Sequence, residues 1–494
     1  MGRQQYSKSR VQRAVTLAEL RGYRWQTFGG LLIAVLLMAA MSGCAGLAGP
    51  AYQRPELAAK PEWRRGEALP NAAEVIQHDW WTGFEDSYLN DLIRRAIKDD
   101  IDLRILAARI EVARVRVQSE RAGTLPKFNL DTSKTLTRQA GQAGVSKSYS
   151  ALVNPSWEVD IWGRVSKGLE AEVSQFKATE ADWRAGYLTL VSDVANKYFE
   201  IGKLDQQIRQ QLTSIGMNQK ILLIYASQHK EGMIAESKLI QQQAETNSLR
   251  KQLLEQQRLR KVAENNLATL LGIPAGEFQL PSQVQLDDIS IPEVPIGLPS
   301  DLLSRRPDII AKELLVLAAH QKLGQARLAR LPKFSLTGSG GFTSSALSTL
   351  LNNWSLSLIP SLAIPIFDPT VKIDIKANEA TTRVAEEEYR KTVMKAFEEV
   401  ENALVNLSSH KQQQQQLSQR LKHLNLVNHT VHSQLKEGMV SELQVLESER
   451  SLLSARLGMA EQKQQILVDT VALYKTLGGG WVQQDLIPVE GNTR

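Results

Sequence analysis

The sequence contains one pattern twice, and the second copy lies 206 residues after the first. KEGMIAE at residues 230–236 returns as KEGMVSE at residues 436–442, and LPKF at residues 125–128 returns at residues 331–334. Because several landmarks agree at one offset, we infer an internal duplication, in which each copy is one supersecondary unit. The chain should therefore fold as two similar units.

Each repeat is predicted to contain a long helical hairpin. Proline is absent from residues 156–273 and 370–487, and apolar residues recur there at spacings of three and four, which is typical of a coiled-coil seam. Glycine is disfavoured inside a helix and suits a turn, so Gly232 and Gly438 are expected at the two tips. A helix over residues 165–230 is on the order of 100 Å long at 1.5 Å per residue.

The predicted helices of the two repeats carry matching end signals. Asp102 and Asp308 stand where a carboxylate can cap free N–H groups at the start of a helix. Gly272 and Gly478 each follow a leucine at a predicted helix end, which is the usual stop position. Both signals occur once per repeat, which supports the duplication.

Four segments have a hydrophobic period of two, which predicts strands with one apolar and one polar face. They are residues 128–138 and 148–161 in the first repeat, and residues 334–344 and 354–366 in the second. A soluble sheet packed on a core and a membrane barrel with an apolar outer surface both fit this alternation.

The N-terminus resembles a bacterial lipoprotein signal. Within residues 1–43 a basic stretch precedes an apolar run that is too short to span a membrane. The run ends at MSGC, a sequence similar to a lipobox, whose Cys44 is the only cysteine of the chain. We therefore expect residues 1–43 to be a signal peptide and Cys44 to carry a covalent lipid that anchors the chain in a bilayer.

A lipid anchor places the chain at a membrane and favours the barrel. Four strands do not close a barrel, and open strand edges are not tolerated in hydrocarbon. Identical chains must therefore share the barrel. Two chains supply eight strands and three supply twelve, of which the wider barrel leaves an aqueous channel; the strand count leaves dimer and trimer both open.

Six further motifs are spread over the chain after Cys44. They are GPAYQRP (49–55), WWTGFED (80–86), PSWEVDIWGR (155–164), LPSDLLSRRPDI (298–309), PSLAIPIFD (360–368) and LYKTLGGGW (473–481). Together they resemble the TolC-like outer-membrane factors, in particular the NodT-like lipoprotein branch that serves resistance–nodulation–division (RND) efflux pumps. The resemblance implies an α+β membrane protein: a homotrimer with a 12-stranded β-barrel, a long periplasmic α-helical barrel and an equatorial domain.

The resemblance also gives the expected organisation of the chain. Residues 44–92 form the lipidated N-terminal segment and the start of the equatorial domain, and residues 489–494 form a C-terminal tail. The first structural repeat covers residues 93–290 and the second covers residues 291–488. The hairpin tips lie at the periplasmic end of the helical tube.

The implied function is a passive conduit in the cell outer membrane that exports small molecules, such as drugs, metals or other toxic compounds. An inner-membrane RND-type transporter supplies the energy, and a periplasmic adaptor protein docks on the tips. The implied docking residues are Lys230, Glu231, Gly232, Met233, Lys436, Glu437, Gly438 and Met439.

In such channels acidic residues beyond the second tip glycine often form a ring at the constriction. The matching positions are Gln444 and Glu447, of which only Glu447 is an acid. Glu447 is therefore a gate candidate, and a solvated carboxylate on a helix surface is the alternative interpretation.

Other function classes have less support. Walker, HExxH and GxSxG patterns are absent, so we expect no enzyme and no cofactor beyond the lipid on Cys44. The net charge of +6 falls to +1 without residues 1–43, which removes the electrostatic basis for nucleic-acid binding. His429 and His432 lie one helical turn apart but lack a third ligand, so no metal site is expected.

Arg305 and Arg306 could bind an anion, and a solvated turn is the preferred interpretation of this pair. Two other functions stay open: a conduit for a type I protein secretion system, and a coiled-coil scaffold lipoprotein that does not pierce the membrane. A scaffold has no use for four alternating strands, which argues for the conduit.

Overall fold

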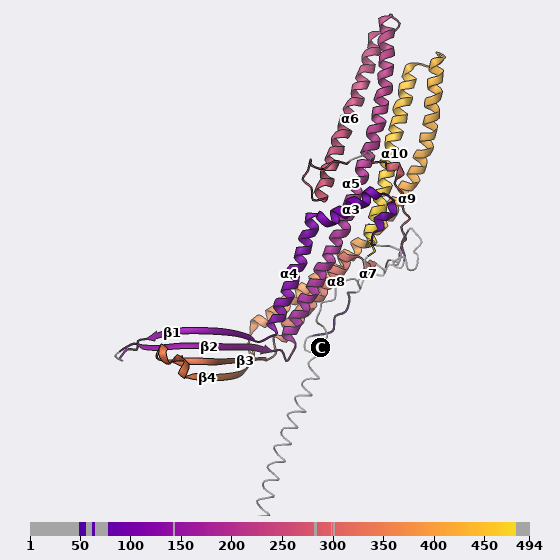
Figure 1. Cartoon of the computed structure of the whole chain (residues 1–494). Helices are drawn as coiled ribbons and strands as arrows, with labels where there is room; N and C mark the ends of the chain where they lie inside the picture. Colours follow the sequence, from indigo (N-terminus) through magenta and orange to yellow (C-terminus); the bar gives the residue numbers. More distant parts are fainter. Residues whose placement is uncertain are drawn as a thin grey trace, which may run out of the picture. The chain divides into compact units, whose positions relative to one another are not determined.

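The structure is a computed structural model (Figure 1). It describes residues 49–55, 62–64, 78–141, 144–280, 284–297, 299 and 302–480. The signal segment, Cys44 and the tail at residues 489–494 lie outside the described residues. The chain divides into two units, one of residues 1–53, 117–172 and 317–383 and one of residues 54–116, 173–316 and 384–494.

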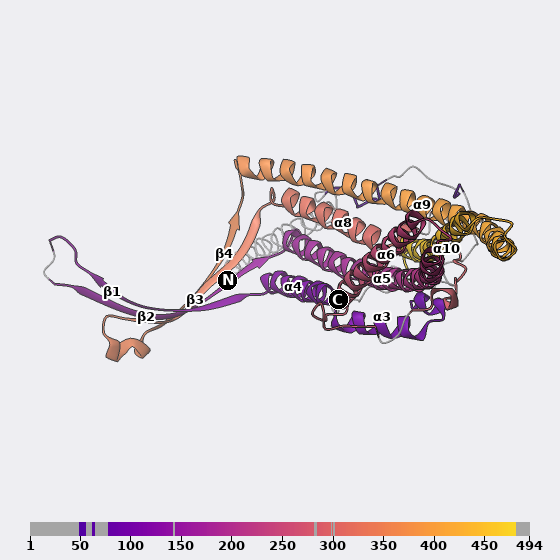
Figure 2. The same ribbon diagram turned by 90° about the horizontal axis from the view of Figure 1, so that it is seen from above.

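The first unit contains a four-stranded antiparallel sheet in the order β1-β2-β3-β4. The strands are β1 (Lys127–Thr137), β2 (Ser146–Val159), β3 (Lys333–Ser344) and β4 (Trp354–Ala363). The central pair, β2 and β3, comes from different repeats, so the sheet joins the repeats, and Figure 2 shows its strong twist. The prediction of four strands is confirmed.

The last apolar residues assigned to two of the strands lie outside them. β2 ends at Val159, before Ile161, and β4 ends at Ala363, before Ile364 and Ile366. The partner strand β3 begins at Lys333, opposite Ala363, so Ile364 and Ile366 have no partner residues in the ladder.

Strand register gives the sheet one mainly apolar and one mainly polar face. The apolar face carries Phe128, Leu130, Val153, Trp157, Phe334, Leu336, Trp354, Leu356, Leu358 and Leu362. The polar face carries Asn129, Asp131, Ser133, Ser150, Asn154, Ser335, Thr337, Ser355, Ser357 and Ser361, with Leu152 and Ile359 as exceptions.

Hydrogen bonds link the strands across the polar face. The Ser133 and Ser150 hydroxyls lie 2.8 Å apart, and Asn154 Nδ2 donates to Asp131 Oδ2 at 2.6 Å. Apolar side chains on the opposite face are uncovered in the single chain, and Leu356 there is 77% exposed. A face of this kind requires an apolar environment or a partner.

Helices α5 and α6 form one hairpin, and α9 and α10 form a second (Figure 1). Their bounds are α5 Arg164–Lys230, α6 Glu236–Leu270, α9 Pro369–Lys436 and α10 Glu442–Thr476. The outgoing helices have 67 and 68 residues and the returning helices have 35 each. No helix in the described part of the chain has both the length and the apolar composition needed to cross a bilayer.

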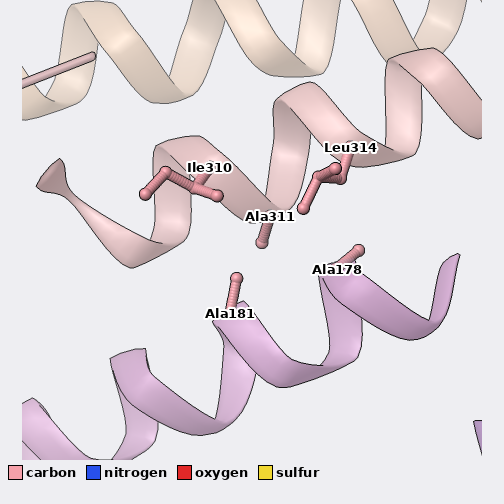
Figure 3. Packing of buried hydrophobic residues seen from close by; sticks show 5 residues of the cluster. All are labelled: Ala178, Ala181, Ile310, Ala311 and Leu314. Carbon is pink, nitrogen blue, oxygen red and sulfur yellow. The ribbon is translucent and has the colours of Figure 1, made fainter. Parts of the chain in front are cut away.

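The remaining helices are short. They are α3 (Ser87–Asp99), α4 (Ile101–Gly123), α7 (Leu302–Arg305) and α8 (Pro307–Leu328), with 3₁₀ turns η2 (Trp80–Phe84), η3 (Leu286–Asp288) and η5 (Leu347–Asn352). In the second unit, Ala178 and Ala181 of α5 face Ile310, Ala311 and Leu314 of α8 (Figure 3). Small side chains at a helix contact allow the helix axes to approach closely.

An aromatic cluster fixes the WWTGFED segment to the long helices of the second unit. Trp80 stacks on Tyr474 of α10 with ring centroids 4.9 Å apart, and Phe84 lies 5.1 Å from Phe199 of α5. Asp86 caps α3 and also accepts a hydrogen bond from the Tyr198 hydroxyl at 2.7 Å. One carboxylate thus holds the start of α3 against α5.

Two predictions about helix starts are wrong. Asp100, not Asp102, caps α4, because its Oδ1 accepts the Leu103 N–H at 2.7 Å while Asp102 already lies within the helix. Arg305 and Arg306 are only 5% and 7% exposed, so the solvated turn expected for them is also wrong.

The Arg306 guanidinium is buried because it has partners from distant segments. Nη2 contacts Asp308 and Glu399, each at 2.7 Å, and Nη1 donates to the Thr476 carbonyl at 3.3 Å. Arg306 therefore satisfies a free carbonyl at the end of α10, a role that cations often have at helix C-termini.

Candidate gate and docking site at the hairpin tips

Both hairpin tips have the same backbone geometry. Gly232 and Gly438 have φ values of +71° and +70°, the left-handed region in which glycine carries no Cβ penalty. Each outgoing helix ends in a Schellman motif. Met233 N–H donates to Gln228 O at 2.8 Å and Gly232 N–H to His229 O at 2.9 Å; in the second tip Met439 donates to Gln434 O at 2.9 Å and Gly438 to Leu435 O at 3.0 Å.

All eight docking residues implied by the resemblance lie at these turns and are exposed. Met233 and Met439 are 72% and 65% exposed. A methionine side chain is apolar and flexible and adapts to differently shaped partners. The two tips therefore present the same chemistry, an apolar methionine beside a Lys-Glu pair.

Two ion pairs join the returning helices of the hairpins near the tips. Lys238 Nζ of α6 lies 3.3 Å from Glu442 Oε2 of α10. Arg450 Nε of α10 donates to Glu245 Oε1 of α6 at 2.9 Å, and its Nη2 binds Glu245 Oε2. The second pair is bidentate, a geometry that fixes the relative position of its partners. The sequence patterns do not predict a role for these four residues.

The two gate candidates have different surroundings. Gln444 is exposed, and its Oε1 accepts the Ser441 backbone N–H at 3.1 Å, so it caps the start of α10. Glu447 is exposed one turn further along the helix. The hydrogen bond with Glu245 raises the pKa of Arg450, and the charge of Glu447 adds to this effect. Glu447 thus belongs electrostatically to the link between α6 and α10.

A buried charge cluster holds the base of the first hairpin. Arg260 of α6 lies 2.5 Å from Asp205 Oδ1 of α5 and 2.8 Å from Glu264 Oε1. Asp205 is 1% exposed, and its Oδ2 also accepts the Val284 N–H at 3.0 Å. The segment after α6 is therefore tied to both helices through one carboxylate.

The two histidines of α9 do not share a ligand set. His432 Nε2 lies 3.1 Å from Glu449 Oε1 of α10. Among the described residues, no group of three His, Cys, Asp or Glu side chains is placed to hold a metal ion. His432 is part of the packing between α9 and α10.

Replacing Gly232 or Gly438 with alanine should destabilise the tip by about 1–2 kcal/mol, because an L-residue is strained in the left-handed region. Hydrogen exchange read by mass spectrometry should become faster in the peptides around the changed turn. The matched control is Gly216→Ala, since Gly216 lies inside α5, where an added methyl group meets open space. If hydrogen exchange at the tips stayed unchanged in both Gly232→Ala and Gly438→Ala, the left-handed conformation assigned to these two glycines would be wrong.

The family comparison matches both repeats. Residues 92–273 and 298–479 each match the family described as outer membrane efflux protein. The two matched segments begin 206 residues apart, which is the offset of the sequence repeat.

Individual relatives match most of the chain. It is 31% identical over 459 residues to the cation efflux system protein CusC of Escherichia coli O6:H1, covering 90% of this chain and 97% of CusC. It is 31% identical over 451 residues to the pyoverdine export outer membrane protein OpmQ of Pseudomonas aeruginosa, covering 87% and 93%. A crystal structure of CusC aligns with a TM-score of 0.79 over 87% of this chain and 99% of that chain, at 28% identity.

The family expected from the six motifs is thus confirmed by comparisons that extend through both helical hairpins and all four strands. The fold agrees as well, since the CusC alignment covers nearly the whole of that protein. The chain belongs to the outer membrane efflux protein family.

Proposed function

We propose that this chain is the outer-membrane component of a tripartite efflux system, where it forms a passive trimeric conduit for small molecules. Drugs, metals and other toxic compounds are the substrate classes, and they pass from the periplasm or an inner-membrane pump to the exterior. A conduit of this kind needs no catalytic residue and no cofactor.

The observation that carries the proposal is the incomplete sheet. Within the described residues β1 pairs only with β2, and β4 pairs only with β3, so each chain has two free edges. Free strand edges and an exposed apolar face together require either lipid and neighbouring strands or a covering partner. Pairing β4 of one chain with β1 of the next satisfies both edges at once.

Three chains supply twelve strands, a number between the 8-stranded barrels filled by side chains and the 16-stranded porins with open channels. The apolar face then points to lipid, and the serine-rich face lines the lumen. The helical hairpins of the same chains form the periplasmic part of the tube.

Partners follow from the export function. CusC is named for cation efflux and OpmQ for pyoverdine export, two cargoes of different chemistry. We therefore assign cargo selection to an inner-membrane RND-type transporter and not to the channel. A periplasmic adaptor docks on the two exposed tips, around Met233 and Met439.

Conductance and mass test the proposal together. Purified full-length protein in detergent should have the mass of three chains by native mass spectrometry, and it should produce discrete conductance steps in a planar lipid bilayer. A scaffold lipoprotein gives no steps. Monomeric material without conductance would contradict the channel, and a conducting dimer would contradict the trimer.

Opening requires the second hairpin to shift against its neighbours, as packed helices do in switching transitions. The links between Lys238 and Glu442 and between Glu245 and Arg450 oppose a shift of α10 relative to α6 in the same chain. Three Glu447 side chains, which lie between Glu442 and Arg450 on α10, surround the proposed constriction.

Glu447→Ala should increase leakage through the closed channel, because it removes three side chains from the constriction. Cells that carry the variant should be inhibited by a lower concentration of a large antibiotic that normally fails to cross the outer membrane. The matched control is Glu255→Ala, which removes an exposed carboxylate of α6 that pairs with Arg258. Equal sensitivity of both variants and wild type would exclude Glu447 from the gate.

Covalent lipid on Cys44 is the proposed anchor, supported by the lipobox-like MSGC sequence. Cys44→Ser should remove the lipid mass from the mature protein and abolish labelling by radioactive palmitate. Because the barrel holds the chain in the membrane by itself, assembled trimer should still be found there. Unchanged labelling of the variant would contradict the assignment.

A further inference from the structure

The connection between β3 and β4 presents exposed leucines at one end of the sheet. It contains the 3₁₀ turn η5, in which Leu347 and Leu351 are 66% and 73% exposed. At the other end of the sheet the strands connect to helices, since α4 and α8 precede β1 and β3, and α5 and α9 follow β2 and β4. η5 therefore lies at the end of the strands opposite to their helical connections, which is the exterior end of the proposed barrel.

Strand register shows on which side of the sheet η5 lies. Ser344 of β3 is an even number of residues after Leu336, and its partner Tyr149 is an even number before Val153. Because side chains alternate along a strand, Ser344 and Tyr149 both belong to the apolar face. Ser344 is 8% exposed, and its hydroxyl lies 2.6 Å from the hydroxyl of Thr349 in η5. η5 thus folds over the apolar face and not over the polar face.

The exposed leucines of η5 point away from the sheet. Residues three apart in a 3₁₀ helix lie on the same side, so Asn352 shares the side of Thr349, which contacts Ser344. Leu347 and Leu351 lie on the two other sides and are exposed. A polar side of η5 therefore faces the protein while its leucines face the surroundings, which is the reverse of the arrangement expected in water.

Lys134 indicates the depth of η5 relative to the bilayer. It pairs with Tyr149 on the apolar face, and its Nζ lies 5.7 Å from the centroid of the Tyr149 ring. A lysine on the lipid face of a barrel is costly at the bilayer midplane and costs little near the interface, where tyrosine is also enriched. The row of Lys134, Tyr149 and Ser344 therefore lies at the level of the lipid headgroups, and η5 is attached to the end of this row.

We propose that η5 is a membrane anchor, whose Leu347 and Leu351 insert between the lipid chains just below the headgroups. Amphipathic segments bind at this boundary by burying their apolar side chains. A lid over the lumen requires η5 on the polar face, which the position of Ser344 contradicts. A neighbouring chain is also a poor partner, because it meets β1 or β4, whereas η5 contacts the central strands β3 and β2. This inference rests on the proposed function, since the apolar face contacts lipid only in the assembled barrel.

The test attaches a bimane fluorophore to single cysteines of the full chain in a Cys44→Ser background, in protein reconstituted into lipid vesicles. The label at Leu351→Cys should lose more fluorescence to a phosphatidylcholine with a nitroxide near the headgroup than to one with a nitroxide near the chain end, and least to iodide in water. Leu358→Cys and Ser357→Cys are the matched controls on the two faces of β4. The Leu358→Cys label should be quenched most by the chain-end nitroxide, and the Ser357→Cys label by iodide.

The controls separate a failure of this inference from a failure of the proposed function. Leu347→Cys should show the same order of quenching as Leu351→Cys, because both leucines insert. If iodide quenches either label more strongly than both nitroxides do, η5 lies in water and the anchor is wrong. If no quencher reaches these labels, the leucines pack against protein, which overturns the anchor as well. In both cases the barrel stands as long as the nitroxides quench Leu358→Cys; without that quenching the barrel is contradicted, and the anchor with it.

Discussion

Arg260→Ala should lower the free energy of unfolding by about 3–5 kcal/mol, because the substitution leaves a buried carboxylate without its cation. Asp205 is 1% exposed, and Arg260 is its charged partner at 2.5 Å. The expected readout is a lower midpoint of thermal unfolding, followed by circular dichroism of the helices in detergent. The segment at residues 284–297 should exchange its amide hydrogens faster, since Val284 depends on the same carboxylate.

Arg258→Ala is the matched control for this prediction. Arg258 lies two residues away on α6, and its pair with Glu255 is exposed on both sides, with 58% and 55% of the side chains accessible. Exposed pairs contribute little to stability because water and salt screen them, so the midpoint should hardly move. Similar midpoints for the two variants would mean that the Arg260 cluster is not buried in the assembled protein.

Leu358→Arg should prevent assembly in the membrane. Leu358 lies in the middle of β4 on the apolar face and is 66% exposed in the single chain. An arginine on the lipid face near the bilayer centre costs about 2–4 kcal/mol, and a trimer carries the substitution three times. The fraction of chains recovered as SDS-resistant trimer from outer membranes should fall strongly.

The neighbouring position provides the control. Ser357 precedes Leu358 in the same strand, and its side chain is on the polar face opposite Ser339. Ser357→Arg should assemble, because its guanidinium reaches the proposed lumen. If both variants assembled equally, the apolar face would not contact lipid, and the soluble sheet considered at the start would again be the better interpretation.

Much of the fold could be predicted because its signals are local. Each hairpin is predicted by a continuous helical period of apolar residues that one glycine interrupts. The predicted start of α5 at residue 165 differs by one residue from the observed start at Arg164. The strands follow from alternation. The ends of the strands could not be predicted from this alternation, because apolar residues such as Ile364 and Ile366 continue it after the pairing of β4 with β3 has ended.

Contacts between distant segments could not be predicted in the same way. Arg306 is a charged residue beside a proline, and its sequence neighbours give no sign of Glu399, which is 93 residues away. The ion pairs near the tips did leave a signal that was missed. Lys238 and Glu442 are 204 positions apart and Glu245 and Arg450 are 205 apart, both close to the repeat offset. Opposite charges at that spacing on α6 and α10 indicate side-by-side placement.

The strand order has a genetic consequence. Each chain ends its sheet with β1 on one edge and β4 on the other, so the contact between chains is head-to-tail and not self-complementary. A single subunit with a damaged edge therefore breaks the closed ring into which it is built. When damaged and normal copies are made in equal amounts, only about one ring in eight is wholly normal for a three-membered ring. Alleles that spoil β1 or β4 should accordingly be dominant over the normal gene.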